Sequence, residues 1–330
     1  MATVIMSGMT VTGETKRDRS AFLGIALLSA LMFGSSGIAA KPLISAGLSP
    51  VHVVWLRIAG AALVLSPLAW RHRALVRERP ALLAAFALLG VAGVQAFYFA
   101  ALSRIPVGVA LLVEYLSPVI ILGWVRFVRG RAVTARAALG AVLAVTGLAC
   151  VVEVWAGLGF DSLGLVFALC AACCQAGYFL LVDQGGSDGR SEPDPIGLIV
   201  YGFLIGAAML TVLVRPWEMD FTVLKGTAEL GTTSVPALLL LGYLVLVATV
   251  FAYVTGVVSV RGLSAPVAGV VACLEAVIAV TLGWFLLGEH LSAPQLIGGA
   301  MVLAGAFVAQ TTAPAGGRDQ DGGVSVQPAL

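Results

Sequence analysis

Charged residues are scarce in this chain, and their scarcity excludes most classes of soluble protein. Asp, Glu, Lys and Arg make up 11% of the 330 residues, whereas apolar residues make up 60%. Because an average soluble domain is about one-quarter charged, this composition predicts a protein that lies in a lipid bilayer. The net charge of +2 also lacks the basic excess of a nucleic-acid-binding surface, so we expect no nucleic-acid partner.

Histidine and cysteine are too few, and too poorly placed, for a catalytic or metal centre. The three histidines, His52, His72 and His290, lie near the ends of apolar segments, and the sequence has no H-E-x-x-H. A C-x-x-C-C pattern at 170–174 lies inside an apolar segment without a nearby histidine or acid. We interpret these cysteines as small buried hydrophobic residues. The sequence therefore predicts no enzyme, no metal and no cofactor.

Long apolar segments make up most of what remains. They do not alternate in polarity as β-barrel strands do, and helices are the other way to satisfy backbone hydrogen bonds in lipid. About 20 apolar residues allow a helix to cross the hydrocarbon core. Ten segments qualify: 21–40, 50–70, 80–102, 105–125, 135–154, 162–182, 196–214, 236–259, 265–287 and 293–312. We therefore predict an all-α integral membrane protein with ten transmembrane helices.

The sequence also contains an internal repeat. Residues 105–121 and 263–279 follow nearly the same template, and each is followed at the same offset by a glycine pair, Gly140 and Gly147 in one half and Gly298 and Gly305 in the other. An odd number of spans per half makes the second half enter the bilayer from the opposite side, so the prediction is two inverted five-helix repeats. The predicted divisions are a cytoplasmic tail at 1–20, repeats at 21–155 and 161–312, and a disordered cytoplasmic tail at 313–330.

Lysine and arginine in the loops predict the orientation. Apart from the intramembrane Arg57, fourteen of the 19 basic residues fall on the side of the N-terminus and four on the other side. Basic residues concentrate on the cytoplasmic side of membrane proteins. We therefore predict a multi-pass protein of the cell (inner) membrane with both termini in the cytoplasm. In the second half this orientation depends mainly on counting spans.

Three ionisable residues lie within the apolar segments. Arg57 lies in the second segment, Glu114 in the fourth and Glu275 in the ninth. A charged group at a helix centre costs about 2.5–3.5 kcal/mol to insert, so these side chains should face the interior of the bundle. One interpretation is a structural ion pair of Arg57 with Glu114. The other is that at least one acid lines a wet cavity and binds a cationic group or a proton.

Aligning the repeats favours a shared central cavity. Ser117 in the first repeat corresponds to Glu275, and Glu114 lies one helical turn before Ser117 on the same face. Each half therefore contributes one acid near its midpoint. The remaining candidates for cavity lining are Gln95, Tyr98, Tyr115, Gln175, Tyr178 and Tyr253.

The sequence resembles the EamA-type family of the drug/metabolite transporter superfamily. The resemblance rests on two stretches of the second repeat, Leu274 to Glu289 with Gly283-Trp284 inside it, and Ala293 to Gly298. The counterpart in the first repeat is Glu114 to Pro118. The family usually has proline after the acid of the ninth helix, where this chain has Ala276. The resemblance covers 21–312 and implies a central cavity lined by helices 1, 3, 4, 6, 8 and 9.

The function that this resemblance implies is secondary transport. The expected protein is an exporter or facilitator of small metabolites, such as amino acids, that works by alternating access at the central cavity. Proton-coupled efflux of drugs or cations is an alternative, and a membrane receptor or scaffold is the alternative outside transport. The substrate, the direction of flux, the coupling ion and the oligomeric state, a homodimer included, stay open at this point.

Overall fold

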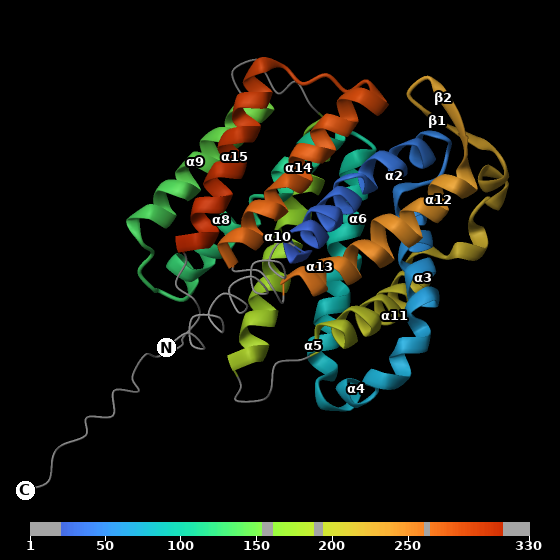
Figure 1. Ribbon diagram of the computed structural model, residues 1–330, viewed down its shortest axis with the longest axis horizontal. Helices are drawn as coiled ribbons and strands as arrows, with labels where there is room; N and C mark the ends of the chain where they lie inside the picture. Colours follow the sequence, from blue (N-terminus) through green and yellow to red (C-terminus); the bar gives the residue numbers. More distant parts are fainter. Residues whose placement is uncertain (1–20, 154–160, 188–193, 261–264, 313–330) are drawn as a thin grey trace, which may run out of the picture.

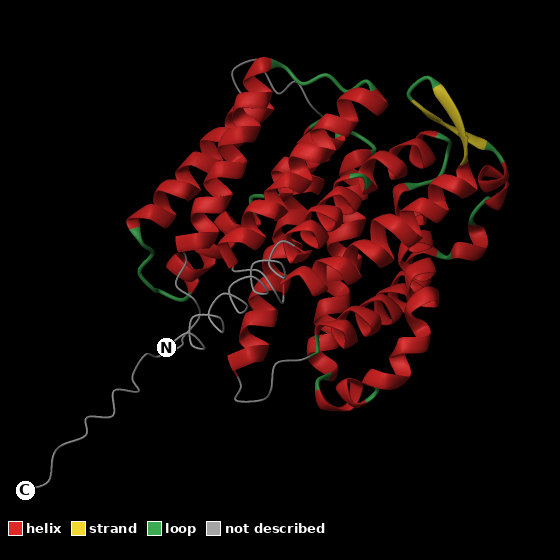
Figure 2. Cartoon of the chain, in the orientation of Figure 1, coloured by secondary structure: helices red, strands yellow, loops and turns green. Residues whose placement is uncertain are grey.

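The computed structural model describes residues 21–153, 161–187, 194–260 and 265–312, and helices dominate it (Figures 1 and 2). Within these residues, eight helices are long and apolar enough to cross a membrane. They are Ala21–Ser45, Pro50–His72, Pro80–Leu102, Val107–Val128, Ala135–Val152, Ser162–Leu181, Pro195–Val214 and Ala237–Ser259. They coincide with the first eight predicted segments to within a few residues. The chain is therefore a multi-pass membrane protein. The predicted tails, 1–20 and 313–330, lie outside the described residues.

Two further apolar helices, α14 (Ala265–Leu287) and α15 (Ala293–Thr312), coincide with the last two predicted segments. Several of the other segments consist of more than one helical element, and the label η marks a short 3-10 or π-helical stretch. In chain order, the elements before α14 include α2 (Ser36–Ser45), α3 (Pro50–Ala69), η1 (Trp70–His72), α4 (Ala74–Glu78), α5 (Pro80–Ala85), η2 (Phe86–Gly93), α6 (Val94–Leu102), α7 (Val107–Glu114), α8 (Ser117–Gly123), η3 (Trp124–Val128), α9 (Ala135–Val152), α10 (Ser162–Ser187), α11 (Pro195–Val214), α12 (Ala237–Val245), η7 (Leu246–Phe251) and α13 (Ala252–Val260).

Side-chain caps define where several helices begin. Ser49, Thr134 and Asp194 precede α3, α9 and α11, and each side chain accepts a hydrogen bond from a backbone N–H two or three residues later. Proline follows two of these caps directly, as Pro50 and Pro195. Proline suits the first helical turn because its missing N–H would have no partner there.

The fourth span is broken at its acid, which differs from the continuous helix predicted over 105–125. Helix α7 ends at Glu114, and α8 begins at Ser117 after a turn in which Leu116 N bonds to the Val113 carbonyl at 3.0 Å. The cause lies in the sequence, because Pro118 has no N–H to donate to the carbonyl of Glu114, four residues earlier. In α14 the equivalent position is Ala276, and that helix runs unbroken.

Glycines bring α9 and α15 into close contact, as Figure 1 shows at one end of the molecule. A Cβ added to Gly147 would lie 2.6 Å from the carbonyl oxygen of Gly298, and one added to Gly140 would lie 2.8 Å from that of Gly305. The residue numbers in these pairs run in opposite directions, so the two helices are antiparallel. Each helix has two of these small residues seven positions apart on one face, which allows the two backbones to approach so closely.

A β-hairpin departs from the prediction of an all-α chain. After the short 3-10 turns η5 (Pro216–Glu218) and η6 (Phe221–Lys225), strands β1 (Thr227–Leu230) and β2 (Thr233–Pro236) pair antiparallel at the edge of the molecule (Figure 2). Gly231 has φ +62°, as the first residue of a two-residue hairpin loop often requires. A Cβ there would lie 2.6 Å from the Leu286 carbonyl oxygen, so the loop packs tightly on the end of α14.

Candidate functional site

A cavity of about 350 Å³ lies between the two halves of the chain. Six of the ten residues predicted for the site line it: Gln95, Glu114, Gln175, Tyr178, Tyr253 and Glu275. They come from α6, α7, α10, α13 and α14, which belong to both predicted repeats. The structure therefore brings the two intramembrane carboxylates to one chamber, with two amide side chains and two phenols beside them.

Aromatic rings form much of the chamber wall. Phe33 packs edge-on against Tyr253 with 4.9 Å between the ring centroids, and Phe86 packs in the same way against Tyr178 at 5.2 Å. All four rings line the cavity. Such pairs hold large side chains in fixed orientations, and their faces attract organic cations.

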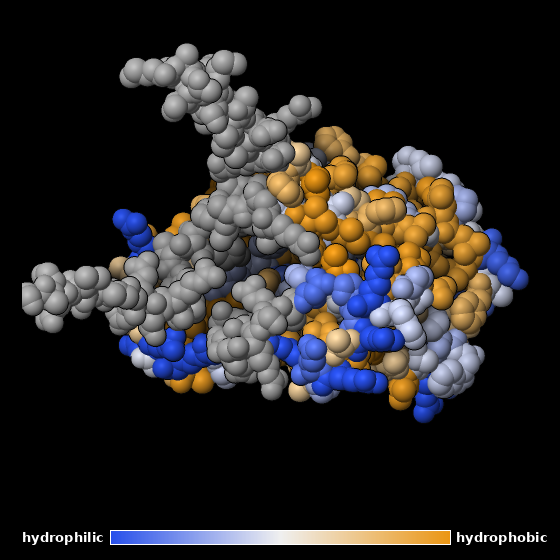
Figure 3. Space-filling view, turned by 60° about the horizontal axis from the view of Figure 1, so that its bottom comes forward, coloured by the Kyte–Doolittle hydropathy of each residue, from blue (hydrophilic) through white to orange (hydrophobic). Residues whose placement is uncertain are grey.

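The lining residues of the chamber reach the helix ends next to α4, and we call this end of the chamber its mouth. Its lining includes Pro195, the first residue of α11, and Val257, near the end of α13. The Nδ1 atom of His72 lies 2.8 Å from a carboxylate oxygen of Asp194, which joins the end of the second span to the start of α11 at the same side. Figure 3 turns this side of the molecule forward and shows hydrophilic residues gathered there beside an apolar flank.

Arg57 lies behind the chamber, and its guanidinium donates hydrogen bonds to protein acceptors. The guanidinium donates to Thr249 Oγ1 at 2.6 Å, to Gln95 Oε1 at 2.8 Å, to the Ala248 carbonyl at 3.0 Å and to Ser36 Oγ at 3.3 Å. Only 2% of the residue is exposed. Arg57 therefore joins three helices of the first half to η7 of the second half, and reaches the cavity wall through Gln95.

The direct ion pair of Arg57 with Glu114 that the sequence left open is not among the ion pairs within 4.0 Å in the described part of the chain. The neutral acceptors around Arg57 take its place. Sequence reasoning missed two of them, Ser36 and Thr249. The sequence contained a signal for them, because a buried guanidinium needs several acceptors, and Thr249 is a hydroxyl residue in a mostly apolar segment.

The other predicted site residues lie outside the cavity lining. Tyr115 forms a hydrogen bond with Glu275 from the neighbouring helix, so it orients an acid of the cavity. Tyr98 is 6% exposed, and its hydroxyl lies against Gly37, where an added Cβ would be 2.9 Å away. Ser117 is 3% exposed at the start of α8. These three residues support the chamber instead of facing it.

No group of three or more His, Cys, Asp or Glu residues in the described part of the chain is arranged to hold a metal ion. Outside the spans, Asp161 lies just before α10. A hydrogen bond from the backbone N–H of Gly164 and the ion pair with Arg104 keep the pKa of the Asp161 carboxyl below its ordinary value.

Comparisons with known proteins found related sequences. The family model of the EamA-like transporter family matches residues 21–153 and 162–311. A protein of Archaeoglobus fulgidus described as an uncharacterized transporter is 27% identical over 288 residues, which cover 86% of this chain and 94% of that protein. The uncharacterized transporter YwfM of Bacillus subtilis is 28% identical over 170 residues, 52% of this chain and 53% of that protein.

A solved crystal structure shares the fold. Its TM-score is 0.57, its sequence is 19% identical, and the alignment covers 89% of this chain and 98% of that one. At this level of identity the likeness concerns the fold alone.

Proposed function

This chain belongs to the EamA-like transporter family, and from that premise we propose that it is a secondary transporter which exports, or facilitates the passage of, small metabolites such as amino acids by alternating access. The observation that carries the proposal is the chamber that both halves build together, with Glu114 from one half and Glu275 from the other. Binding at an interface between repeats is the usual arrangement in secondary transporters.

The proposed topology has ten spans in two inverted five-helix repeats. Helices α14 and α15 contain 23 and 20 residues, or about 35 and 30 Å at 1.5 Å per residue, which is enough to cross the hydrocarbon core. The antiparallel contact of α9 with α15, the last helix of each repeat, supports this topology. Cytoplasmic termini and an inner-membrane location follow from the distribution of lysine and arginine in the sequence. In this orientation the chamber opens to the cytoplasm.

A specific observation favours a second candidate, the proton-coupled efflux of organic cations. The chamber lining contains two carboxylates and five aromatic rings, and its described residues include no lysine or arginine. Arg57, the nearest guanidinium, already donates to four protein acceptors. A buried carboxylate needs a cation or a proton as its partner, so an amine and a proton would compete for this chamber.

Transport by purified protein in lipid vesicles tests both candidates. We expect Glu275→Gln to abolish flux, and Glu229→Gln, which alters an exposed acid of the hairpin, to leave flux unchanged. Amine flux that follows the pH gradient supports the cation exporter, whereas amino-acid flux that ignores the gradient supports a facilitator. Undiminished flux in Glu275→Gln rejects a role for that carboxylate. Ligand binding without any flux supports the receptor or scaffold alternative.

A further inference from the structure

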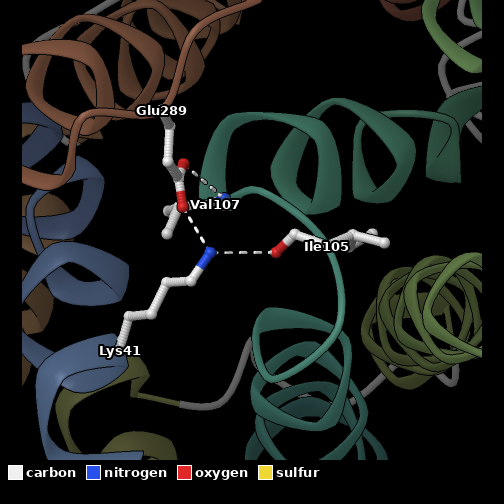
Figure 4. A network of polar contacts seen from close by, with 4 residues as sticks. All are labelled: Lys41, Ile105, Val107 and Glu289. Atoms are coloured by element: carbon white, nitrogen blue, oxygen red, sulfur yellow. Dashed lines mark hydrogen bonds and ion pairs between the residues drawn. The ribbon is translucent and has the colours of Figure 1, made fainter. Parts of the chain in front are cut away.

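A second polar network lies where three segments meet, outside the chamber (Figure 4). The ammonium group of Lys41 forms an ion pair with Glu289 and donates to the Ile105 carbonyl at 3.3 Å. The other carboxylate oxygen of Glu289 accepts the backbone N–H of Val107 at 2.9 Å. The side chains of Lys41 and Glu289 are 27% and 12% exposed, so protein covers most of this pair.

The network and the chamber mouth lie at opposite ends of the same helices. In the third span, Phe86 lines the chamber near the start, whereas Ile105 follows the end of the span, 19 residues later. At about 1.5 Å per residue, that separation is about 28 Å, close to the thickness of the hydrocarbon core. In the second half, Glu275 lines the chamber and Glu289 follows the last turn of the same helix, α14. The pair therefore lies beyond the end of the chamber that is opposite its mouth.

We propose that Lys41 and Glu289 form a latch that closes the transport route on the side opposite the chamber mouth and must open once in each cycle. The proposal deepens the transport function proposed above and rests on it. Lys41 belongs to α2 of the first half, and Glu289 follows α14 of the second half, so the latch joins elements that must separate for the chamber to open on this side. In alternating access one side is closed while the other is open, so a latch on this side matches a mouth on the opposite side.

Each partner of the latch is connected to the chamber through a helix. Five residues before Lys41, Ser36 accepts a hydrogen bond from Arg57, whose guanidinium also donates to the chamber residue Gln95. Fourteen residues before Glu289, the same polypeptide carries Glu275. A shift of α2 or α14 on binding a substrate therefore moves one half of the latch. Glu289 also caps the amino end of α7, the helix that ends at Glu114, so Arg57, Glu114 and Glu275 are each linked to this site.

The test measures which side of the membrane gives access to the chamber. In a variant without its native cysteines, Val94→Cys supplies a thiol in the chamber wall, and a membrane-impermeant maleimide is applied from either side of the membrane. We expect Lys41→Gln and Glu289→Gln to raise labelling from the side of the latch about fivefold or more, the lower end of typical coupling between two states. The exchange Lys41→Glu with Glu289→Lys should return labelling toward the original rate.

Glu218→Gln is the matched control. Glu218 pairs with Arg215 in the loop after α11, and both side chains are about 60% exposed. The variant therefore removes the acid of an ion pair that does not connect the two halves of the chain. Labelling that stays equal in Lys41→Gln, Glu289→Gln and Glu218→Gln would overturn the latch. These measurements need no substrate, so they report on the latch even if no transported compound is found.

A cross-link covers the case in which the single variants fail to fold. In Val94→Cys with Lys41→Cys and Glu289→Cys, a short cleavable thiol cross-linker between positions 41 and 289 should stop labelling at position 94 from the latch side, and cleavage should restore it. Labelling at position 94 is read by mass spectrometry on its own peptide, because cleavage also frees thiols at the two latch positions. Unchanged labelling after complete cross-linking would equally overturn the proposal. Because the same molecules are measured before and after cleavage, loss of folding cannot imitate the expected result.

Discussion

Adding one methyl group to Gly147 tests the contact between the two halves. In Gly147→Ala, the new Cβ would lie 2.6 Å from the Gly298 carbonyl oxygen, 2.7 Å from the Val302 nitrogen and 2.8 Å from the Met301 Cβ. Two of these atoms belong to the backbone of α15 and cannot rotate away. Since ordinary contact begins near 3.4 Å, α9 and α15 must move apart by most of an ångström.

The size of the effect follows from two opposing contributions. Overpacking costs about 1–3 kcal/mol, and rigid backbone neighbours put this site at the upper end of that range. Replacing glycine by alanine inside a helix returns up to about 1 kcal/mol through helix propensity. We therefore expect Gly147→Ala to lower the free energy of unfolding by about 2 kcal/mol.

The matched control is Gly242→Ala in α12. Gly242 is also helical, and an added Cβ there meets no atom within 4 Å, so only the propensity gain remains. Thermal unfolding in detergent, followed by the loss of the monodisperse peak in size-exclusion chromatography, ranks the two variants. A Gly147→Ala protein as stable as Gly242→Ala would refute the close packing of α9 against α15.

Three further predictions concern other parts of the structure. Arg57→Lys should lower the free energy of unfolding by about 1–3 kcal/mol, because an ammonium cannot serve the same four acceptors; an unchanged unfolding temperature would contradict the network. Gly231→Ala should cost about 2–3 kcal/mol and Gly288→Ala about 1 kcal/mol, since both have positive φ but only at Gly231 would an added Cβ meet another atom, the backbone oxygen of Leu286; equal losses in thermal unfolding would argue against that contact. The lowered pKa of Asp161 stabilises the fold above the pKa of an unfolded aspartate, about 3.9, and this contribution is lost as the pH falls through the lower folded value. The stability difference between wild type and Asp161→Asn should therefore begin to shrink as the pH falls below about 3.9, and a difference that does not change down to the lowest pH at which both proteins fold would oppose this assignment.

The sequence was sufficient for the spans because lipid imposes a strong rule. A helix must be long and apolar to cross the membrane, so segments such as 196–214 can be recognised without any tertiary information. The break after Glu114 was accessible in principle, since Pro118 cannot donate to the Glu114 carbonyl, but a proline near the start of a new helix and a proline within one look alike in sequence. The hairpin at 227–236 was not predicted from the sequence, because its strands are only four residues long and lie in a loop between two spans.

The candidate site was only partly accessible for a different reason. Buried acids and amides such as Glu275 and Gln175 stand out in an apolar segment, and the structure places them in one chamber. Tyrosines do not stand out in the same way, because packing alone can account for a Tyr in a helix. Tyr253 faces the chamber, whereas Tyr98 packs behind it. The partners of Arg57 and the pair of Lys41 with Glu289 depend on distances between segments far apart in the chain, which no spacing within one segment reveals.

The most direct test of the central claim asks whether position 275, which carries the acid of the second half, is accessible to water. In a variant without native cysteines, Glu275→Cys and Val277→Cys place thiols two residues apart on α14, the first in the chamber and the second on the outer surface of the helix bundle, where the valine is 46% exposed. An impermeant maleimide added from the cytoplasmic side should label position 275 and leave position 277 unlabelled. Labelling of 277 without 275 would mean that the acid faces lipid, and would contradict a transport chamber shared by the two halves.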